Sequence, residues 1–344
     1  MMGKKVSGAS KTSEQKGSLK FKNDDMFSFK VTSGPEEDEL SKDAMGGTEL
    51  MKYGLYDRLP EDLRDSVQII CSRVRQIDEH RPSILWLHDL AEDPEVRDLQ
   101  HAKFREQFDK LVFVSNWQQQ RYYQHLGVPY EDGIVLKNAI EPFENIEKPN
   151  DKIRLIYHTT PHRGLDILVA AFTKLYEDRQ DIELDVYSSF KLYGWAERDK
   201  PYEELFDFCR QHPGINYHGS VDNATVRTAL SKAHIFAYPS VWQETSCISA
   251  IEALAAGCLT VCPNYAALPE TCANFAWMYT WHSDKQQHAN LFAGVLKHAI
   301  ENHDRPDVKQ MLDLQRVYFN TFYNWDGRVK EWHGLLEGVN KGYQ

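Results

Sequence analysis

Apolar residues fall along the chain into two repeating kinds of segment. Short, almost wholly apolar runs, such as residues 84–89 and 153–159, predict strands that are buried on both faces of a sheet. Longer segments with apolar residues three and four positions apart, such as 116–126 and 165–178, predict amphipathic helices. Strand and helix alternate, which is typical of an α/β protein whose parallel sheets are covered by helices.

The alternation occurs twice and predicts two domains. The first set has strands at 66–73, 84–89, 110–115 and 134–140, with helices at 94–108 and 116–126. Residues 141–151, EPFENIEKPND, contain two prolines and many charges, which indicates a linker. The second set has strands at 153–159, 182–189, 215–219, 234–240 and 259–264, with helices at 165–178, 201–212 and 226–233. We therefore predict two Rossmann-like doubly wound domains, 23–145 and 151–323.

The ends of the chain and its charge add little to this fold but exclude some functions. Residues 1–22 are polar and rich in lysine, which predicts a flexible tail, and residues 27–34 suggest a short strand. With 40 basic and 51 acidic residues, the net charge of −11 disfavours general binding to nucleic acid or anionic membranes. No apolar run reaches eighteen residues, and the N-terminus lacks a secretory apolar core. We expect a soluble, cytoplasmic protein without a transmembrane segment; peripheral attachment stays open.

The stretch ETSCISAIEALAAG carries two glutamates inside an apolar pattern. It predicts a helix that opens at Glu244 and ends at Gly257. The free backbone amides at its N-terminus would be those of Thr245, Ser246, Cys247 and Ile248. Such amides form a ready site for a phosphate. Glu252 lies eight residues on, about 12 Å along the axis and on nearly the same face. The two carboxylates could hold the sugar and ribose hydroxyls of a nucleotide sugar; a capping glutamate and a surface glutamate would explain the same pattern.

Three further positions lie where α/β proteins bind ligands. Arg163, on a strand-to-helix loop, could grip a diphosphate through two hydrogen bonds. Gly46 and Gly47 precede a helix and would let backbone amides approach a phosphate. His88 ends an apolar strand and could serve as a donor or proton relay. An arginine at a helix start, a simple turn and a hydrogen-bonded core histidine are the plainer interpretations.

Together these motifs resemble GT-B glycosyltransferases, in particular glycosyltransferase family 4. The resemblance rests on Glu244 and Glu252 with ALAAG after them, and on residues 113–143, 217–264 and 267–271. It covers about residues 44–335 and is stronger in the second half. It implies a retaining enzyme that moves a sugar from a UDP-, GDP- or ADP-linked donor to an acceptor hydroxyl. It also implies that no metal or other cofactor is needed, and the chain has no Asp-x-Asp motif.

The resemblance also implies roles for individual residues. Glu244 and His88 would contact the donor sugar, and Glu252 would bind the ribose. Arg163 would neutralise the diphosphate leaving group, helped by the amides after Glu244 and by the loop of Gly46 and Gly47. The helix of residues 324–344 would pack back on the first domain. The chain departs from the family by having Tyr157 and His158 where a second basic residue usually stands, and Lys191 is a candidate substitute.

The acceptor and the exact activity stay open. The acceptor could be a glycan, a lipid-linked sugar, a protein or a modified nucleic acid. A transferase acting on hydroxymethylated DNA bases would need a basic face on the first domain, formed by Arg73, Arg75, Arg81, Lys103, Arg105 and Arg121. The same fold would also serve a nucleotide-sugar epimerase, or a degenerate, non-catalytic module that binds sugar nucleotides.

Overall fold

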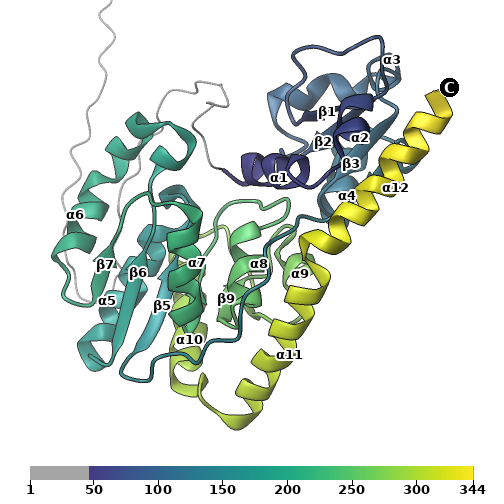
Figure 1. The fold of residues 1–344 in the computed structure, drawn as a ribbon. Helices are drawn as coiled ribbons and strands as arrows, with labels where there is room; N and C mark the ends of the chain where they lie inside the picture. Colours follow the sequence, from purple (N-terminus) through teal and green to yellow (C-terminus); the bar gives the residue numbers. More distant parts are fainter. Residues whose placement is uncertain (1–45, 344) are drawn as a thin grey trace, which may run out of the picture.

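The structure, a computed structural model, describes residues 46–343 (Figure 1). The predicted tail at 1–22, the strand suggested at 27–34 and the remainder of residues 23–45 lie outside this range. Two parallel sheets dominate the described part of the chain, each covered by helices. The prediction of an α/β protein with two doubly wound sheets is therefore confirmed.

Within residues 46–343, the first sheet has four parallel strands in the order β1-β2-β3-β4. These strands are β1 Gln68–Cys71, β2 Ser83–Leu87, β3 Lys110–Phe113 and β4 Gly133–Val135. Every side chain of β2 is buried, as expected for a central strand with helices on both faces. Alternate residues point to opposite faces. Trp86 therefore joins one apolar cluster, and its neighbours Leu85 and Leu87 join another.

In the same described range, the second sheet has six parallel strands in the order β10-β9-β8-β5-β6-β7. They are β5 Ile153–Tyr157, β6 Ile182–Val186, β7 Ile215–Tyr217, β8 Ile235–Ala237, β9 Leu259–Pro263 and β10 Trp277–Tyr279. From β5 the successive strands β6 and β7 are added on one side of the sheet, and from β8 onward they are added on the other side, next to β5. Such a switch point opens a crevice at the carboxyl ends of the strands, where ligands of α/β proteins bind.

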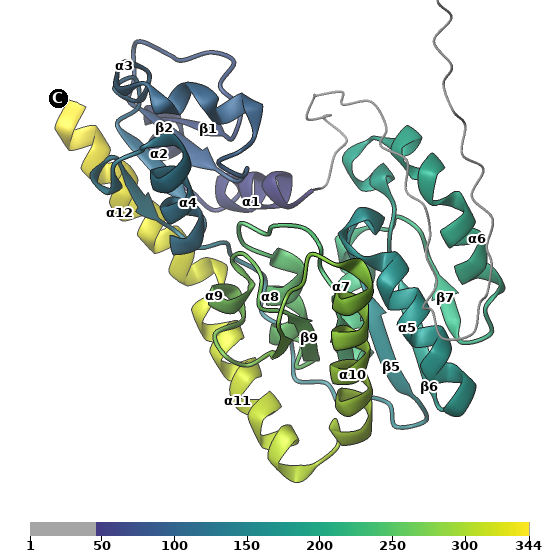
Figure 2. The same ribbon diagram turned by 180° about the vertical axis from the view of Figure 1, so that it is seen from behind.

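Helices connect the strands and cover the sheets (Figures 1 and 2). The α-helices are α1 Gly47–Tyr56, α2 Glu61–Ser66, α3 Ala102–Arg105, α4 Asn116–Leu126, α5 Leu165–Asp178, α6 Glu203–Gln211, α7 Asn223–Lys232, α8 Ile248–Ala255, α9 Leu268–Cys272, α10 Lys285–Asn302, α11 Pro306–Phe322 and α12 Trp325–Tyr343. The 3₁₀ helices are η1 Pro94–Gln100, η2 Tyr130–Asp132, η3 Pro161–Arg163, η4 Phe190–Tyr193 and η5 Ala196–Tyr202. α4 and α5 begin and end at the predicted residues. Gly127, in the left-handed conformation, ends α4 as expected.

The single helix predicted at 94–108 is wrong. Residues 94–100 form the 3₁₀ helix η1, and α3 is a separate single turn. His101 between them has extended backbone angles, φ −93° and ψ 122°, which interrupt the helical hydrogen bonds. The apolar spacing of Val96 and Leu99 fits either kind of helix, so the sequence pattern did not separate the two.

The two sheets are joined by residues 136–152 and by the end of the chain. Ile140 forms an isolated parallel bridge with Asn324, at the point where α11 gives way to α12. α11 runs along the second sheet, and α12 (yellow) continues beside the first (Figure 1). Trp332 and Leu336 of α12 are fully buried in the cluster that contains Trp86. The domain limits proposed from the sequence stay predictions.

Candidate active site

Arg163 and Glu244 form an ion pair at the carboxyl ends of the central strands of the second sheet. Arg163 ends η3, the turn after β5, and Glu244 lies in the segment after β8. Nη1 of Arg163 donates to Oε1 of Glu244, and so does the hydroxyl of Tyr238. Burial favours the neutral form of Arg163, but Glu244 and the weaker effects of Tyr238, Tyr193 and Cys247 together outweigh it, so the pKa of Arg163 lies well above its usual range. Arg163 therefore remains a cation in an enclosed site.

Two features distinguish the surroundings of Arg163. Its Nε is buried and has no hydrogen-bond partner among residues 46–343, so one edge of the guanidinium stays free. Gly164, which follows it, has φ +113° and lies against the backbone of Pro239. A Cβ at position 164 would come within 2.3 Å of that residue's carbonyl oxygen, so only glycine permits this close approach.

The helix predicted to open at Glu244 begins instead at Ile248. The carbonyls that would start it are bonded elsewhere: that of Glu244 accepts from the amide of Ala267 at 3.1 Å. The carbonyl of Thr245 accepts from the hydroxyl of Ser115 at 2.6 Å, and that of Ser246 from Asn138 at 3.4 Å. The free amides of α8 are therefore those of its own first turn, which starts at Ile248. Thr245, Ser246 and Cys247 lie before the helix.

The segment before α8 contacts the first sheet directly. The hydroxyl of Thr245 donates to the carbonyl of His88 at 2.8 Å, while its own carbonyl accepts from Ser115. His88 follows β2 and Ser115 follows β3, so both lie at carboxyl ends of the first sheet. The structure thus brings together the predicted site residues from both sheets. The local sequence pattern does not show these contacts, because the partners lie 157 and 130 positions apart.

His88 is enclosed and uncharged. Its amide donates to the hydroxyl of Ser72 at 3.1 Å, and its ring lies 4.7 Å from that of Trp86. Burial lowers the pKa of His88 to about 3, so the imidazole is neutral near pH 7. Its Nε2 is buried without a hydrogen-bond partner among residues 46–343. A neutral imidazole with a free ring nitrogen can exchange a hydrogen bond with a ligand hydroxyl.

Gly46 and Gly47 allow α1 to approach the second sheet closely. Gly46 is the N-cap of α1, and a Cβ there would lie 2.2 Å from the ring of Tyr193 in η4. A Cβ on Gly47 would lie 3.1 Å from the side chain of Ile248. Both glycines therefore face the second domain across the site. Tyr193 was not predicted, because nothing in its local sequence distinguishes it from a core tyrosine.

Glu252 lies on α8 beside a cavity of about 280 Å³. The cavity wall includes Arg58, which follows α1, Glu141 of the linker, Arg227 of α7 and Trp325 of α12. The side chain of Glu252 pairs with Arg227, with 3.0 Å between Oε1 and Nη1. Burial raises the pKa of this carboxyl, while Arg227 opposes the rise. The separation of about 12 Å expected between the glutamates does not apply, since Glu244 lies outside the helix.

Among residues 46–343, the position of the second basic residue expected before Arg163 holds no cation. His158 occupies that position, and burial lowers its pKa to about 3, so it is neutral near pH 7. The pKa of His162 is also lowered to about 3 by burial, with Arg163 and Arg198 adding to the effect. Lys191 is exposed on η4, and the proposal that it substitutes stays untested. Arg198 lies close enough to His162 to lower its pKa, and no sequence pattern pointed to this arginine.

The family model for glycosyl transferases group 1 matches residues 137–308, which is half of the chain. The chain belongs to this family. A search of curated proteins finds no match. The matched residues include Arg163, Glu244 and Glu252. His88 and the glycine pair of this group 1 glycosyltransferase lie outside the matched region.

Solved structures show that this group 1 glycosyltransferase has the GT-B fold. A glycosyltransferase from Rickettsia africae has a TM-score of 0.63 and 13% identity, covering 89% of this chain and 84% of its own. Anabaena HepE, solved with UDP and glucose, has a TM-score of 0.58 and 14% identity, covering 75% and 72%. Sucrose-phosphate synthase from Thermosynechococcus elongatus has a TM-score of 0.58 and 17% identity, covering 76% and 69%. At these identities the likeness concerns the fold alone.

Among residues 46–343, no helix combines the length and apolar character that crossing a membrane requires.

Proposed function

We propose that this group 1 glycosyltransferase transfers a hexosyl or pentosyl unit from a nucleoside diphosphate sugar to an acceptor hydroxyl. The observation that supports this most strongly is the enclosed Arg163–Glu244 pair, which lies at the switch point of the second sheet. The segment that carries Glu244 also contacts His88 from the first sheet. Solved relatives of this fold bind such ligands: Anabaena HepE was solved with UDP-glucose, and a pneumococcal O-GlcNAc transferase with UDP and GlcNAc.

The arrangement suits departure of a nucleoside diphosphate. Negative charge grows on the phosphate as the sugar leaves, and Arg163 offers its free Nε to that charge. The first-turn amides of α8 add partial positive charge on the same side. Arg163 keeps its contact with Glu244 through Nη1, so the pair and the phosphate do not compete for the same donor. Interactions that form only as the charge develops stabilise the transition state more than the ground state, and they therefore lower the barrier.

Glu244, His88 and Glu252 would hold the donor at three points. Glu244 would accept hydrogen bonds from hydroxyls of the sugar, and the neutral ring of His88 would contact the sugar near the reacting carbon. Glu252 would accept from the ribose hydroxyls inside the 280 Å³ cavity. Retention of configuration, by attack of the acceptor on the face that the leaving group vacates, and independence of metal ions belong to the same proposal.

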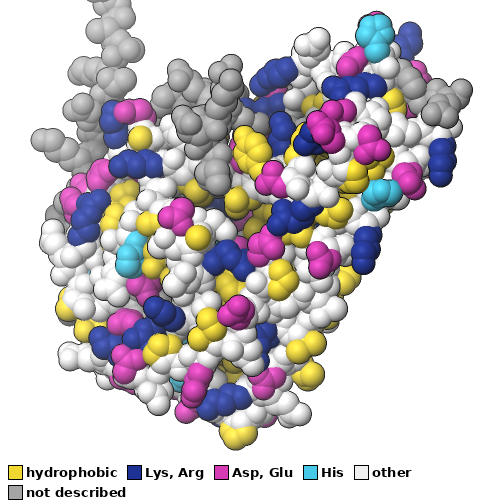
Figure 3. Space-filling model, in the orientation of Figure 1, with side chains coloured by type: hydrophobic (Ala, Val, Ile, Leu, Met, Phe, Trp, Pro, Cys, Tyr) yellow, Lys and Arg dark blue, Asp and Glu magenta, His cyan; other side chains and the backbone are white. Residues whose placement is uncertain are grey.

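Glycosylation of modified DNA bases lacks support from the surface. Most arginines that could have formed a basic face are paired with acids: Arg75 with Glu95, Arg81 with Asp78, Arg105 with Asp132 and Arg121 with Glu92. Figure 3 shows basic and acidic side chains interspersed over the face it presents. A nucleic-acid surface normally gathers charge of one sign. Glycans, lipid-linked sugars and proteins remain the acceptors to search.

The test is release of nucleoside diphosphate from a panel of UDP-, GDP-, ADP- and dTDP-sugars. It is run with EDTA and with added Mg²⁺, for the wild type and for Glu244→Gln. We expect slow hydrolysis of one donor by the wild type, equal in both buffers, and about a hundredfold loss in the variant. NMR of the product with an added acceptor reports the anomeric configuration. Turnover of no donor in either buffer would favour a binding module without catalysis.

A further inference from the structure

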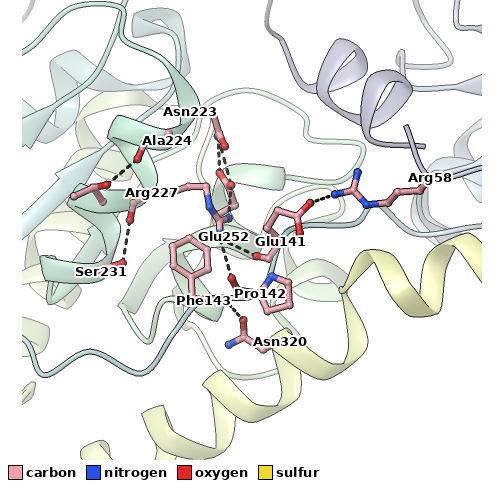
Figure 4. A network of polar contacts seen from close by, with 11 residues as sticks. Arg58, Glu141, Pro142, Phe143, Asn223, Ala224, Arg227, Ser231, Glu252 and Asn320 are labelled. Carbon is pink, nitrogen blue, oxygen red and sulfur yellow. Dashed lines mark hydrogen bonds and ion pairs between the residues drawn. The ribbon is translucent and has the colours of Figure 1, made fainter. Parts of the chain in front are cut away.

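Glu252 has few partners for a buried carboxylate. It is 6% exposed, and its strongest contact is with Arg227. Asn223 adds only long contacts, 3.5 Å from its Nδ2 to each carboxylate oxygen. Figure 4 shows Arg227 and Asn223 approaching Glu252 from α7. The remaining hydrogen-bonding capacity of this carboxylate faces the cavity that it lines.

Arg227 also binds the linker between the two sheets. Its Nη2 donates to the carbonyl of Glu141 at 2.9 Å and to that of Pro142 at 3.1 Å. Its guanidinium carbon lies 3.7 Å from the centre of the Phe143 ring, a short cation–π distance. One guanidinium therefore joins Glu252 to three consecutive linker residues (Figure 4). Its planar array of donors can make these bonds together, whereas a lysine could not.

The linker is held in turn by both halves of the molecule. The amide of Phe143 donates to Oδ1 of Asn320 on α11 at 2.6 Å. The carboxylate of Glu141 pairs with Arg58, which follows α1 in the first domain. Arg58 lies over the ring of Trp325, 5.2 Å from its centre. The position of Arg227, and with it that of Glu252, is thus set by contacts that span the junction of the domains.

We propose that Arg227 is a positioning residue for the donor: it orients Glu252 toward the ribose hydroxyls and fixes that carboxylate to the interdomain linker. This inference rests on the proposed function. Arg227 also lines the cavity, but we assign its effect to its contact with Glu252. A carboxylate must be ionised to accept from two hydroxyls, and Arg227 is its cationic partner on α7. The other charged groups at the cavity are Asp57 and Arg58, which follow α1, and Glu141 of the linker.

The experiment measures binding of UDP, GDP, ADP and dTDP by calorimetry from pH 5 to pH 8. The nucleotide that the wild type binds most tightly is then tested with Arg227→Gln and Arg227→Lys. We expect Arg227→Gln to raise Kd about 10- to 100-fold at pH 7 and by more at pH 5, because loss of the cation favours protonation of Glu252. Arg227→Lys keeps the positive charge but cannot bond Glu252 and the linker carbonyls together, so Kd should rise about threefold.

A double variant and a matched control separate positioning from a merely structural role. In a Glu252→Gln background, Arg227→Gln should add little further loss, because its effect passes through Glu252. Arg154→Gln is the control: its side chain is 18% exposed, as is that of Arg227, and it pairs with Asp151 and Glu183. That variant should bind the nucleotide like the wild type.

The outcomes distinguish this inference from the proposed function. If the wild type binds none of the four nucleotides, the proposed function fails and this inference falls with it. If the wild type binds one and both Arg227 variants bind it equally well at every pH, only this inference is overturned. Tighter binding by Arg227→Gln would also overturn it, since Arg227 would then compete with the ribose for Glu252. Should Arg227→Gln show no cooperative unfolding, Arg227→Lys carries the test.

Discussion

At the scale of single residues, the proposed function gives the enclosed Arg163–Glu244 pair a chemical role beside its structural one. An ion pair in a buried site stabilises little by itself, yet removing one member leaves an uncompensated charge. Glu244 also accepts from Tyr238, so its carboxylate does not depend on Arg163 alone for partners. The cation therefore has a free edge available for chemistry without losing its anchor.

We predict that Arg163→Gln lowers kcat for donor cleavage about 100- to 1000-fold, because the charge that stabilises the departing diphosphate is lost. The variant should also lose about 3–5 kcal/mol of unfolding free energy, since the buried charge of Glu244 no longer has a cation beside it. Nucleoside diphosphate release and urea unfolding measure the two effects.

The double variant Arg163→Gln with Glu244→Gln is the control for that experiment. It should regain much of the stability without regaining activity, because the uncompensated charge is gone but the cation is still missing. A kcat within threefold of wild type for Arg163→Gln would contradict the role assigned to this arginine.

A second residue-scale prediction concerns Gly46. The Gly46→Ala substitution places a methyl group 2.2 Å from the Tyr193 ring, a distance that forces α1 and η4 apart. We expect KM for the donor to rise about tenfold, because the glycine loop no longer closes on the second sheet. Adding Tyr193→Ala should restore room for the methyl group and recover part of the loss; a KM unchanged by Gly46→Ala would contradict this placement.

At the scale of elements, Glu270 joins the two sheets through a helix N-terminus. Its carboxylate accepts from the amides of Asn116 and Trp117, at 2.9 and 2.8 Å, and pairs with Lys137. Asn116 and Trp117 form the first turn of α4, where a negative charge is favourable. Burial would raise the pKa of Glu270, but the Lys137 contact and these amides outweigh burial and lower it. Its stabilising contribution is present above the ordinary pKa of a glutamate and is lost as pH falls through the lowered value.

We predict that Glu270→Ala lowers the unfolding free energy at pH 7 by about 1–3 kcal/mol, since two amides and a cation lose their partner. Glu197→Ala is the comparison: that glutamate is 80% exposed and pairs with the similarly exposed Lys200. A pair of this kind contributes about 1 kcal/mol or less. Equal losses in the two variants by urea unfolding would show that Glu270 does not tie the domains together.

The sequence predicted which helices and strands are present better than it predicted where they end and what they contact. The apolar runs identified every strand of both sheets described in residues 46–343 except β10, which was missed. α5 was right at both ends, because its apolar spacing and its flanking residues agree. The start of α8 was wrong, because the carbonyls before it are bonded to residues from distant elements. Arg227 and Tyr193 were missed for the same reason: their partners lie in other elements. The roles given to the predicted site residues stay predictions.

At the scale of the whole molecule, burial of histidines makes stability depend on pH. The pKa of each of His88, His158 and His162 is lowered to about 3, from an ordinary value of 6.5, chiefly by burial. Between pH 6.5 and pH 3, the unfolded chain binds protons that the folded chain does not bind. Stability should therefore fall as pH falls through this window, by roughly 2 kcal/mol for each histidine at pH 5.

We predict that His158→Gln flattens this dependence. Urea unfolding at pH 7 and pH 5 should show a difference in unfolding free energy roughly 2 kcal/mol smaller than in the wild type. His125→Gln, which changes an exposed histidine, should leave the difference unchanged. Parallel changes in all three proteins would mean that His158 does not stay neutral in the folded chain.

The measurement that tests the central claim most directly is a crystal structure of the protein with the nucleoside diphosphate of its preferred donor. The account predicts the diphosphate between Arg163 and the first turn of α8, with the ribose hydroxyls within hydrogen-bonding distance of Glu252. A nucleotide bound elsewhere, or a ribose away from Glu252, would contradict it.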